Sequence, residues 1–218
     1  MAKRKKIIVI FDIGEAWKRH FILDSSLQVL ESDKVPIVST EDDEGDKAGN
    51  LERATSWVVK TIAKVESMRT YDLRGFNFTC SSTTLVHIGH KGDPIFPLFS
   101  TKKAFPHSLY KDFEYRHNQH KLHPIETGSP GVGMVNSGFQ MFWLKYRRPY
   151  LYGQIRHSLH LPQYFSFLFT GIPLSDFTSI GCHSAMWNFQ QKSMHNWVTE
   201  ENIDKKLAPL VTSWHTVN

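Results

Sequence analysis

The sequence contains little cysteine and no long hydrophobic run. Cys80 and Cys182 are the only cysteines, and they lie too far apart to suggest a disulfide framework or a zinc cage. No apolar stretch is long enough to span a bilayer. The apolar run after the basic residues 3–6 is interrupted at Asp12, too early for a signal peptide. We therefore expect a reduced, cytoplasmic protein with no membrane partner.

An excess of charge of one sign is also missing. Lys and Arg number 26 against 21 Asp and Glu, which gives a formal net charge of +5. This mildly basic balance does not require nucleic acid, which is not the expected partner. With 40% hydrophobic and 13% aromatic residues, the composition is ordinary for a soluble globular protein. A chain of 218 residues can form one large domain or two small ones.

Several familiar ligand-binding motifs are absent. Residues 126–133 are glycine-rich but lack the Gly-Lys-Ser/Thr ending of a P-loop, so the glycines predict a turn. Residues 39–50 are polar and acidic, yet no Glu stands at the last position of a calcium loop, and a solvated connection is expected. His117, His120 and His123 are evenly spaced, but no Cys or carboxylate completes a zinc set.

What the sequence does contain is an apolar strand that ends in a carboxylate and a glycine. Residues 7–11 are rich in β-branched side chains, which is typical of a strand buried on both faces. Asp12 and Gly14 follow directly, and residues 19–24 predict a second strand. Glycine lets backbone N–H groups approach a phosphate, and the carboxylate can hold Mg²⁺ directly or through water. The alternative is a plain strand that ends in a turn.

The rest of the chain predicts strands and helices in mixed order. Residues 51–68 have apolar side chains at helical spacing, and Asn50 can cap the first turn. A second helix is expected to start at Asn136 or Ser137. Further strands are expected at residues 28–31, 75–80, 85–88 and 158–161, and a further helix at residues 162–171. This order predicts an α/β fold in which helices pack on a mixed sheet.

A series of short motifs, taken in order, resembles the FGGY carbohydrate kinases, in particular their rhamnulokinase-like and xylulokinase-like members. The motifs are residues 12–14, 51–57, 126–130, 142–146, 158–164, 168–171 and 175–179. The resemblance covers nearly the whole chain. It implies an actin-like, ribonuclease-H-like lobe with a mixed β-sheet flanked by helices. It also implies ATP- and Mg²⁺-dependent phosphorylation of a sugar or polyol hydroxyl.

The resemblance is to one lobe only. Members of the family have two lobes around a cleft, and residues 1–218 match the amino-terminal lobe. The family's general-base aspartate and the carboxy-terminal nucleotide-binding lobe have no match here, so no catalytic residue is carried over. Phosphoryl transfer depends on positioning and charge neutralisation among nucleophile, metal and phosphates. We therefore expect this chain to be inactive when isolated.

The resemblance assigns a cofactor site to the opening hairpin. Asp12 matches the metal-side aspartate, and Gly14 matches the phosphate-loop glycine. Arg19 matches the basic residue that closes the motif, with Lys18 beside it. Glu15 departs from the family, whose members usually carry a phosphate donor after the glycine. A negative charge there disfavours a triphosphate.

The resemblance also assigns substrate-binding positions to Ser82, Thr83 and Asn136. Hydroxyl and amide groups can hydrogen-bond a polyol. The alternatives are a Ser/Thr-rich loop for the first two residues and a simple helix cap for Asn136. Asp176 matches a structural turn residue of the family.

Two other classes of protein fit some of the same residues. A ribonuclease-H-like nuclease or nucleic-acid binder would place a metal at Asp12, but its two-metal chemistry needs several converging carboxylates, and no clear set is present. A non-catalytic kinase remnant would be compatible with Glu15 and with the missing lobe. Self-association into a homo-oligomer is left open.

Overall fold

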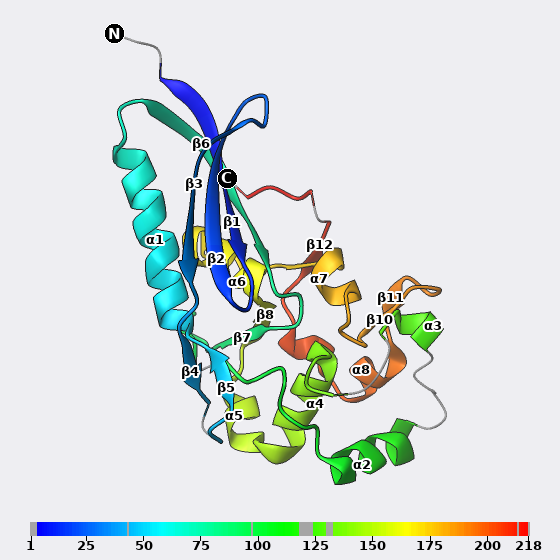
Figure 1. The fold of residues 1–218 in the computed structure, drawn as a ribbon. Coiled ribbons are helices and arrows are strands. Elements are labelled where there is room, and N and C mark those ends of the chain that lie inside the picture. The colour runs from blue at the N-terminus through cyan, green and yellow to red at the C-terminus, as the bar shows by residue number, and fades with distance from the viewer. Residues whose placement is uncertain are drawn as a thin grey trace. The chain divides into compact units, whose positions relative to one another are not determined.

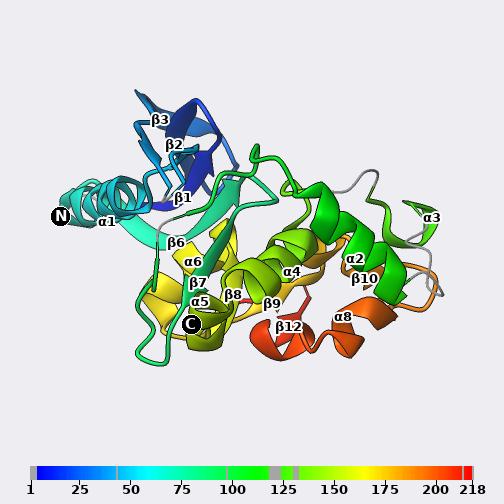
Figure 2. The same cartoon turned by 90° about the horizontal axis from the view of Figure 1, so that it is seen from below.

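The protein divides into two compact units. The computed structural model describes residues 4–42, 44–96, 98–117, 124–129, 133–212 and 214–217. The first unit comprises Met1–Glu41 and Lys47–Ser81, and the second comprises Asp42–Asp46 and Ser82–Asn218. Figures 1 and 2 show the elements of each unit. Each unit is described below by itself.

The first unit is built on a four-stranded mixed sheet. Its strands are β1 (Lys5–Ile13), β2 (Trp17–Asp24), β3 (Val29–Pro36) and β6 (Tyr71–Cys80), in the order β3-β2-β1-β6. β2 runs antiparallel to both β1 and β3, whereas β6 runs parallel to β1. Two short strands, β4 (Ser39–Glu41) and β5 (Lys47–Gly49), form a separate hairpin. The predicted mixed sheet is therefore confirmed.

Helix α1 (Leu51–Ser67) packs against one face of this sheet (Figure 1). The side chain of Asn50 accepts a hydrogen bond from Arg53 N at 2.9 Å, so the predicted cap is confirmed. The buried side of the helix carries Val58, Ile62 and Val65. The ring of Phe11 on β1 meets that of Trp57 edge-on at 5.4 Å.

Strand β1 shows a clear two-residue alternation of burial. Ile7, Val9, Phe11 and Ile13 are buried, whereas the residues between them, including Asp12, are only half-buried. Side chains of a strand point alternately to opposite faces, so the first set shares one face of the sheet and Asp12 lies on the other. The prediction of a strand fully buried on both faces was wrong in this respect.

The second unit is centred on helix α4 (Ser137–Arg147). All residues from Ser137 to Leu144 are buried. Phe113 of α2 (His107–His117) and Trp197 of α8 (Asn196–Glu200) pack on Phe139 of α4, with ring centroids 4.7 and 5.7 Å apart. In Figures 1 and 2, α2 lies alongside α4. A helix enclosed on all sides is apolar all round, which explains its aromatic sequence.

The other elements of the second unit are short. The strand pairs are β7 (Leu85–Ile88) with β8 (His157–His160), β9 (Ser175–Asp176) with β12 (Leu210–Val211), and β10 (Trp187–Asn188) with β11 (Ser193–Met194). The helices are α3 (Pro124–Thr127), α5 (Pro149–Gln154), α6 (Leu161–Thr170) and α7 (Phe177–Gly181), with a 3-10 turn at Asp204–Lys206. Of the described helices, none is long and apolar enough to cross a bilayer.

The segment expected to be a solvated connection is ordered and partly buried. Asp42, Glu44 and Asp46 direct their carboxylates at Lys103 Nζ, at 3.1, 2.7 and 3.2 Å. The Lys103 side chain is only 6% exposed. The expectation was wrong for Asp42, which is buried and helps to neutralise the Lys103 ammonium group, whereas Glu44 and Asp46 reach that group from partly exposed positions. The glycine-rich residues 126–133 are described only in part, since residues 130–132 lie outside the described ranges.

Candidate functional site

Asp12 and Arg19 form an ion pair across the opening hairpin. They are directly opposite each other in the β1–β2 register, so their side chains share one face of the sheet. Arg19 Nε donates to Asp12 Oδ2 at 2.9 Å, and Arg19 Nη2 contacts the same oxygen. Both side chains are partly exposed, at 47% for Arg19 and 27% for Asp12. The pairing brings together two of the residues predicted for the cofactor site.

The carboxylate of Asp12 retains an oxygen that can bind a cation. Its described hydrogen bonds all go to Oδ2, and no donor among the described residues contacts Oδ1. Mg²⁺ is commonly held by one or two protein carboxylates, with water and phosphate oxygens completing its shell. The described residues contain no group of three His, Cys, Asp or Glu that could hold a metal by itself. Asp12 therefore fits a Mg²⁺ ion that is bound largely through a phosphate ligand.

Gly14 lies in the exposed turn between the two strands. Gly14 N donates to Trp17 O at 3.0 Å, which closes the turn. Its φ is not in the left-handed region, and an added Cβ would meet only Trp17 O, at an ordinary 3.5 Å. The fold therefore does not require glycine at this position. Glu15, which departs from the family pattern, is also exposed in this turn.

Lys18 is separated from the other predicted cofactor residues. It is buried on the face of the sheet that α1 covers, with Nζ 5.3 Å from the centre of the Trp57 ring. Burial, together with the nearby Arg53, lowers the pKa of Lys18. Because neighbouring residues of a strand point to opposite faces, Lys18 and Arg19 cannot both face Asp12. The structure thus brings together Asp12, Gly14 and Arg19, but not Lys18.

Ser82 and Thr83 follow β6 and begin the second unit. Thr83 is buried, and its carbonyl oxygen accepts a hydrogen bond from Gln140 Nε2 of α4 at 2.8 Å. The same amide group donates to Met134 O at 2.6 Å. Gln140, which the sequence analysis missed, therefore fixes the backbone of this segment. The sequence signal for this role was a single amide side chain among the otherwise apolar residues 138–144.

Asn136 stands at the N-cap position of α4 but does not cap the helix. Its side chain makes no capping hydrogen bond. Instead Nδ2 donates to His183 O at 2.8 Å, while Oδ1 is buried without a described partner. The reading of Asn136 as a simple cap was therefore wrong. The residue is only 1% exposed, so a sugar hydroxyl can reach Oδ1 only if the surrounding segment moves.

Further buried polar contacts surround the start of α4. His160 Nε2 lies 2.9 Å from Ser137 Oγ, and His87 Nδ1 lies 2.8 Å from Ser158 Oγ. Burial lowers the pKa of His87 to about 3, with a smaller contribution from His160. Burial likewise lowers the pKa of His160 to about 4. Both rings are neutral near pH 7 and enclosed, so these contacts are structural.

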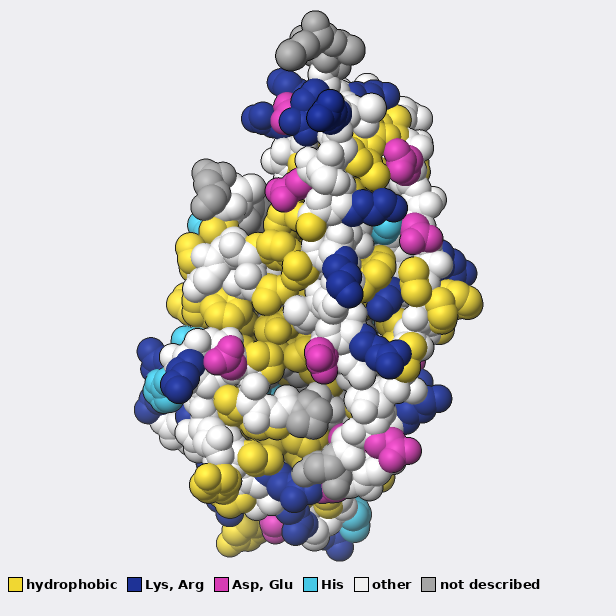
Figure 3. All heavy atoms as spheres, turned by 90° about the vertical axis from the view of Figure 1, so that its left-hand side faces the viewer, with side chains coloured by type: hydrophobic (Ala, Val, Ile, Leu, Met, Phe, Trp, Pro, Cys, Tyr) yellow, Lys and Arg dark blue, Asp and Glu magenta, His cyan; other side chains and the backbone are white. Residues whose placement is uncertain are grey.

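Charges of both signs are mixed on the face of the molecule drawn in Figure 3. Lys and Arg side chains are interspersed with Asp and Glu there, and they do not form a continuous basic stripe. A basic stripe is the usual electrostatic mark of a nucleic-acid binder.

Asp176, the expected turn residue, caps α7, since its Oδ1 accepts a hydrogen bond from Ser179 N at 2.7 Å.

Solved structures of sugar kinases share this fold. A carbohydrate kinase from Novosphingobium aromaticivorans matches with a TM-score of 0.86 and 21% identity, over 99% of this chain and 44% of that one. Xylulose kinase from Lactobacillus acidophilus matches with a TM-score of 0.79 and 14% identity, over 94% of this chain and 42% of that one. Glycerol kinase from Plasmodium falciparum, solved with ADP, matches with a TM-score of 0.72 and 14% identity, over 95% and 43%.

These matches confirm the predicted fold, an α/β lobe like those of the actin-like ATPases. The chain spans less than half the length of the solved structures that it matches. A search of curated proteins found no match. A model of the FGGY family of carbohydrate kinases, N-terminal domain, matches residues 7–214. The chain therefore belongs to the FGGY family of carbohydrate kinases, of which it represents the N-terminal domain.

Proposed function

We propose that this chain is the amino-terminal lobe of a cytoplasmic carbohydrate kinase that transfers the γ-phosphoryl group of ATP to a sugar or polyol hydroxyl. The nucleotide-binding lobe and the catalytic base are supplied by a segment outside residues 1–218. The observation that carries this proposal is the Asp12–Arg19 pair beside the exposed turn at Gly14, in a chain whose residues 7–214 match the N-terminal domain of the FGGY family.

The roles follow from the chemistry of the hairpin. Bound Mg²⁺ would neutralise phosphate charge, and Asp12 would hold it through Oδ1 or an intervening water. Arg19 orients the Asp12 carboxylate and presents a partly exposed guanidinium group to an anionic ligand. The exposed turn at Gly14 leaves room for phosphate oxygens to approach. Lys18 faces away from this group, so we assign it no direct contact.

Sugar binding is proposed for the segment that starts the second unit. Ser82 and Thr83 offer hydroxyl groups, and Gln140 holds the Thr83 backbone in place. Asn136 has a buried, unpartnered carbonyl oxygen at the start of α4, and a sugar hydroxyl is a suitable donor for it. Groups outside this segment also help to determine which sugar or polyol is bound.

The first prediction is that the isolated chain has no sugar-dependent ATPase or kinase activity. Half of a cleft cannot position the nucleophile, the metal and the phosphates together. A coupled assay of ADP release should stay at the sugar-free baseline over a panel of pentuloses, deoxyhexuloses and polyols. Sugar-dependent ADP release well above that baseline would show that this chain contains a complete active site.

A thermal-shift screen separates a competent lobe from a non-catalytic remnant. A lobe that still binds its substrate is stabilised by it, because a ligand that binds only the folded state raises the free energy of unfolding. At least one sugar or polyol should therefore raise the melting temperature in a concentration-dependent manner. If no sugar, and no nucleotide with Mg²⁺, shifts the melting temperature, the remnant is the better description.

A further inference from the structure

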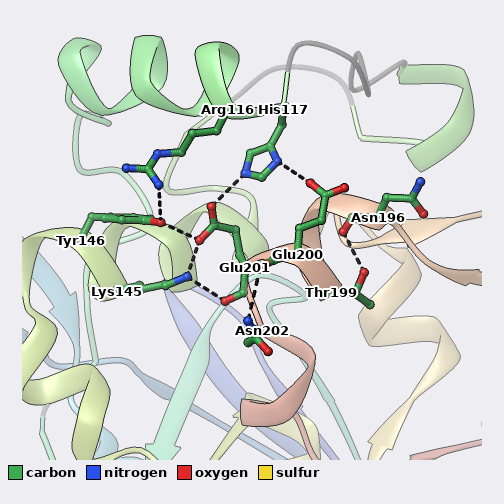
Figure 4. Close-up of polar contacts among 9 residues, drawn as sticks. All are labelled: Arg116, His117, Lys145, Tyr146, Asn196, Thr199, Glu200, Glu201 and Asn202. Atoms are coloured by element: carbon green, nitrogen blue, oxygen red, sulfur yellow. Dashed lines mark hydrogen bonds and ion pairs between the residues drawn. The ribbon is translucent and has the colours of Figure 1, made fainter.

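Helix α4 makes two sets of polar contacts within the second unit, and the first is a charged cluster near its C-terminal end (Figure 4). Lys145 Nζ and Tyr146 Oη donate to Glu201 Oε2, the latter at 2.7 Å. His117 of α2 lies between two carboxylates, with Nε2 2.9 Å from Glu201 Oε1 and Nδ1 3.0 Å from Glu200 Oε2. These groups contact one another, and neither proposed ligand site includes them. The cluster therefore serves the packing of α2, α4 and α8.

The second set of contacts belongs to Gln140, in the middle of α4. Its Nε2 donates to Thr83 O at 2.8 Å and to Met134 O at 2.6 Å. A carbonyl oxygen only accepts hydrogen bonds, so the amide nitrogen, which carries two hydrogens, is the atom that must face both carbonyl groups. One amide group thus joins residues 82–84, which follow β6, to residues 133–136, which lead into α4.

The two segments are otherwise held by different neighbours. Leu161 N donates to Thr84 O at 3.0 Å, whereas Asn136 Nδ2 donates to His183 O at 2.8 Å. Neither of these contacts fixes one segment relative to the other. Gln140 does so directly, because one of its two hydrogen bonds ends on each segment.

The bridge made by Gln140 is shielded from water. Gln140, Thr83 and Met134 are only 4%, 8% and 2% exposed, and the neighbouring Phe139 and Met141 are fully buried. A buried carbonyl oxygen that loses its donor has little access to a water molecule that could replace it, which is costly. An apolar side chain of the same size would pack here without the cost of burying an amide. The two carbonyl oxygens therefore account for the amide at this position.

We propose that Gln140 is a positioning residue of the sugar site. Its amide group sets the spacing between Ser82 and Thr83 on one segment and Asn136 on the other, so that both segments can contact the same sugar or polyol. Gln140 itself does not contact the sugar, because it is buried and its amide nitrogen already donates twice. The role rests on the sugar binding proposed above.

Two consequences follow for the binding of a sugar. Groups that bind a ligand must be held within about 0.5 Å of their productive positions. Segments that are no longer joined meet this condition in a smaller fraction of the molecules, and the apparent affinity falls by that fraction. The coupling is also reciprocal, so a sugar that contacts both segments stabilises the bridge.

Titration calorimetry tests the first consequence, with xylulose, rhamnulose and glycerol as probes for pentuloses, deoxyhexuloses and polyols. Gln140→Met keeps the length of the side chain and removes both hydrogen bonds. It should weaken binding of the tightest of the three probes about tenfold or more. Leu144→Met is the matched control, because it places the same side chain at a fully buried position one turn further along α4. It should change the affinity about twofold at most.

Hydrogen exchange in the unmodified chain tests the second consequence and does not require a variant to fold. Binding of the same probe should slow exchange of the Gln140 side-chain hydrogens about tenfold, as measured by nuclear magnetic resonance. The reference is the half-buried Gln163 of α6, whose Oε1 accepts a hydrogen bond from Ser179 Oγ. Its side-chain exchange should not change.

The outcomes separate the positioning role from the sugar site itself. An unchanged affinity in folded Gln140→Met, or unchanged exchange at Gln140 with the probe bound, would overturn the positioning role and leave the sugar site standing. Equal weakening by Gln140→Met and Leu144→Met would also overturn it, because the effect would then come from a general loss of packing in α4. If none of the probes binds the unmodified chain, the sugar site fails and the positioning role fails with it.

Discussion

Gly14 can be tested separately from the fold that contains it. Its backbone is compatible with other residues, and an added Cβ meets no atom closer than 3.5 Å. We predict that Gly14→Ala leaves the melting temperature within a degree or so of the parent, since exposed substitutions of this kind change stability little. The same variant should weaken nucleotide binding several-fold, because the methyl group occupies space that a phosphate oxygen would need. Thermal unfolding and titration with Mg²⁺ and ADP measure the two effects.

Gly153→Ala is the matched control for this prediction. Gly153 is also exposed, and an added Cβ there has nothing within 4 Å. It lies in α5 of the second unit, whereas the opening hairpin belongs to the first, so its substitution should affect neither stability nor nucleotide affinity by much. An unchanged nucleotide affinity in Gly14→Ala would mean that the turn does not contact phosphate.

Glu201 should determine much of the acid stability of the protein. Its pKa is lowered from 4.5 to about 2 in the folded state, so its contribution is present above pH 4.5 and is lost as the pH falls towards 2. Glu201→Gln should cost about 3–5 kcal/mol at neutral pH, the usual cost of breaking a buried ion pair. The variant should also lose less stability on acidification than the parent.

Denaturant unfolding at a series of pH values measures this effect. Glu200→Gln is the comparison, because the Glu200 side chain is 44% exposed and should contribute less at neutral pH. Equal acid sensitivity of Glu201→Gln and the parent would show that another carboxylate dominates acid unfolding.

Single residues show where sequence reasoning succeeds and where it stops. Family position alone assigned Asp12 and Arg19 to one cofactor site, and the hairpin register places them opposite each other. Their separation from Lys18 follows from strand alternation, which could have been applied in advance. The contacts of Asn136 and His117 could not, because their partners lie 47 and 83 residues away along the chain. Buried polar partners of this kind are set by tertiary packing.

At the level of elements, strand β3 is an edge strand whose pairing groups are protected. Ile37 N donates to Ala16 O at 2.9 Å, so alternation makes the N–H of Lys34 point away from β2. That N–H is taken up by Asp33 Oδ1 at 2.8 Å, and Pro36, the next position facing outward, has no N–H. Charged side chains and proline at a free edge are the usual protection against pairing with another chain.

We predict that Asp33→Ala increases self-association. The substitution frees the outward N–H of Lys34 and removes a charge from the edge, so that another strand can pair there. Light scattering at high protein concentration should show larger particles than for the parent. Asp93→Ala removes the same charge from an exposed turn outside any strand and should not have this effect. Equal association of the two variants would assign the effect to net charge rather than to the edge.

Most of the longer elements were predictable, although α2 was not expected. Helix α1, with its Asn50 cap, followed from local periodicity and capping. Strand β3 was expected to be much shorter, since its polar residues 31–34 carry no apolar alternation. An edge strand pairs on one side and is exposed on the other, so its sequence carries only a weak apolar pattern from which it could be predicted. The contacts of Asp42, Glu44 and Asp46 could not be predicted, because their partner Lys103 lies far along the chain.

At the scale of the whole molecule, the two proposed ligands should bind different units. The nucleotide groups, Asp12, Gly14 and Arg19, belong to the first unit, whereas Ser82, Thr83 and Asn136 belong to the second. Hydrogen exchange can resolve the two, because a bound ligand protects the amides that it orders. We predict that ADP with Mg²⁺ protects the β1–β2 turn, and that a sugar found by thermal shift protects residues 82–84 and the start of α4.

Gly14→Ala makes this prediction selective. It should remove the protection given by ADP with Mg²⁺ and preserve the protection given by the sugar, because the two ligands contact groups in separate units. Sugar protection that disappears together with nucleotide protection would show that the variant perturbs the whole lobe. Protection by ADP confined to the second unit would place the phosphate site elsewhere and would remove the opening hairpin from the proposed mechanism.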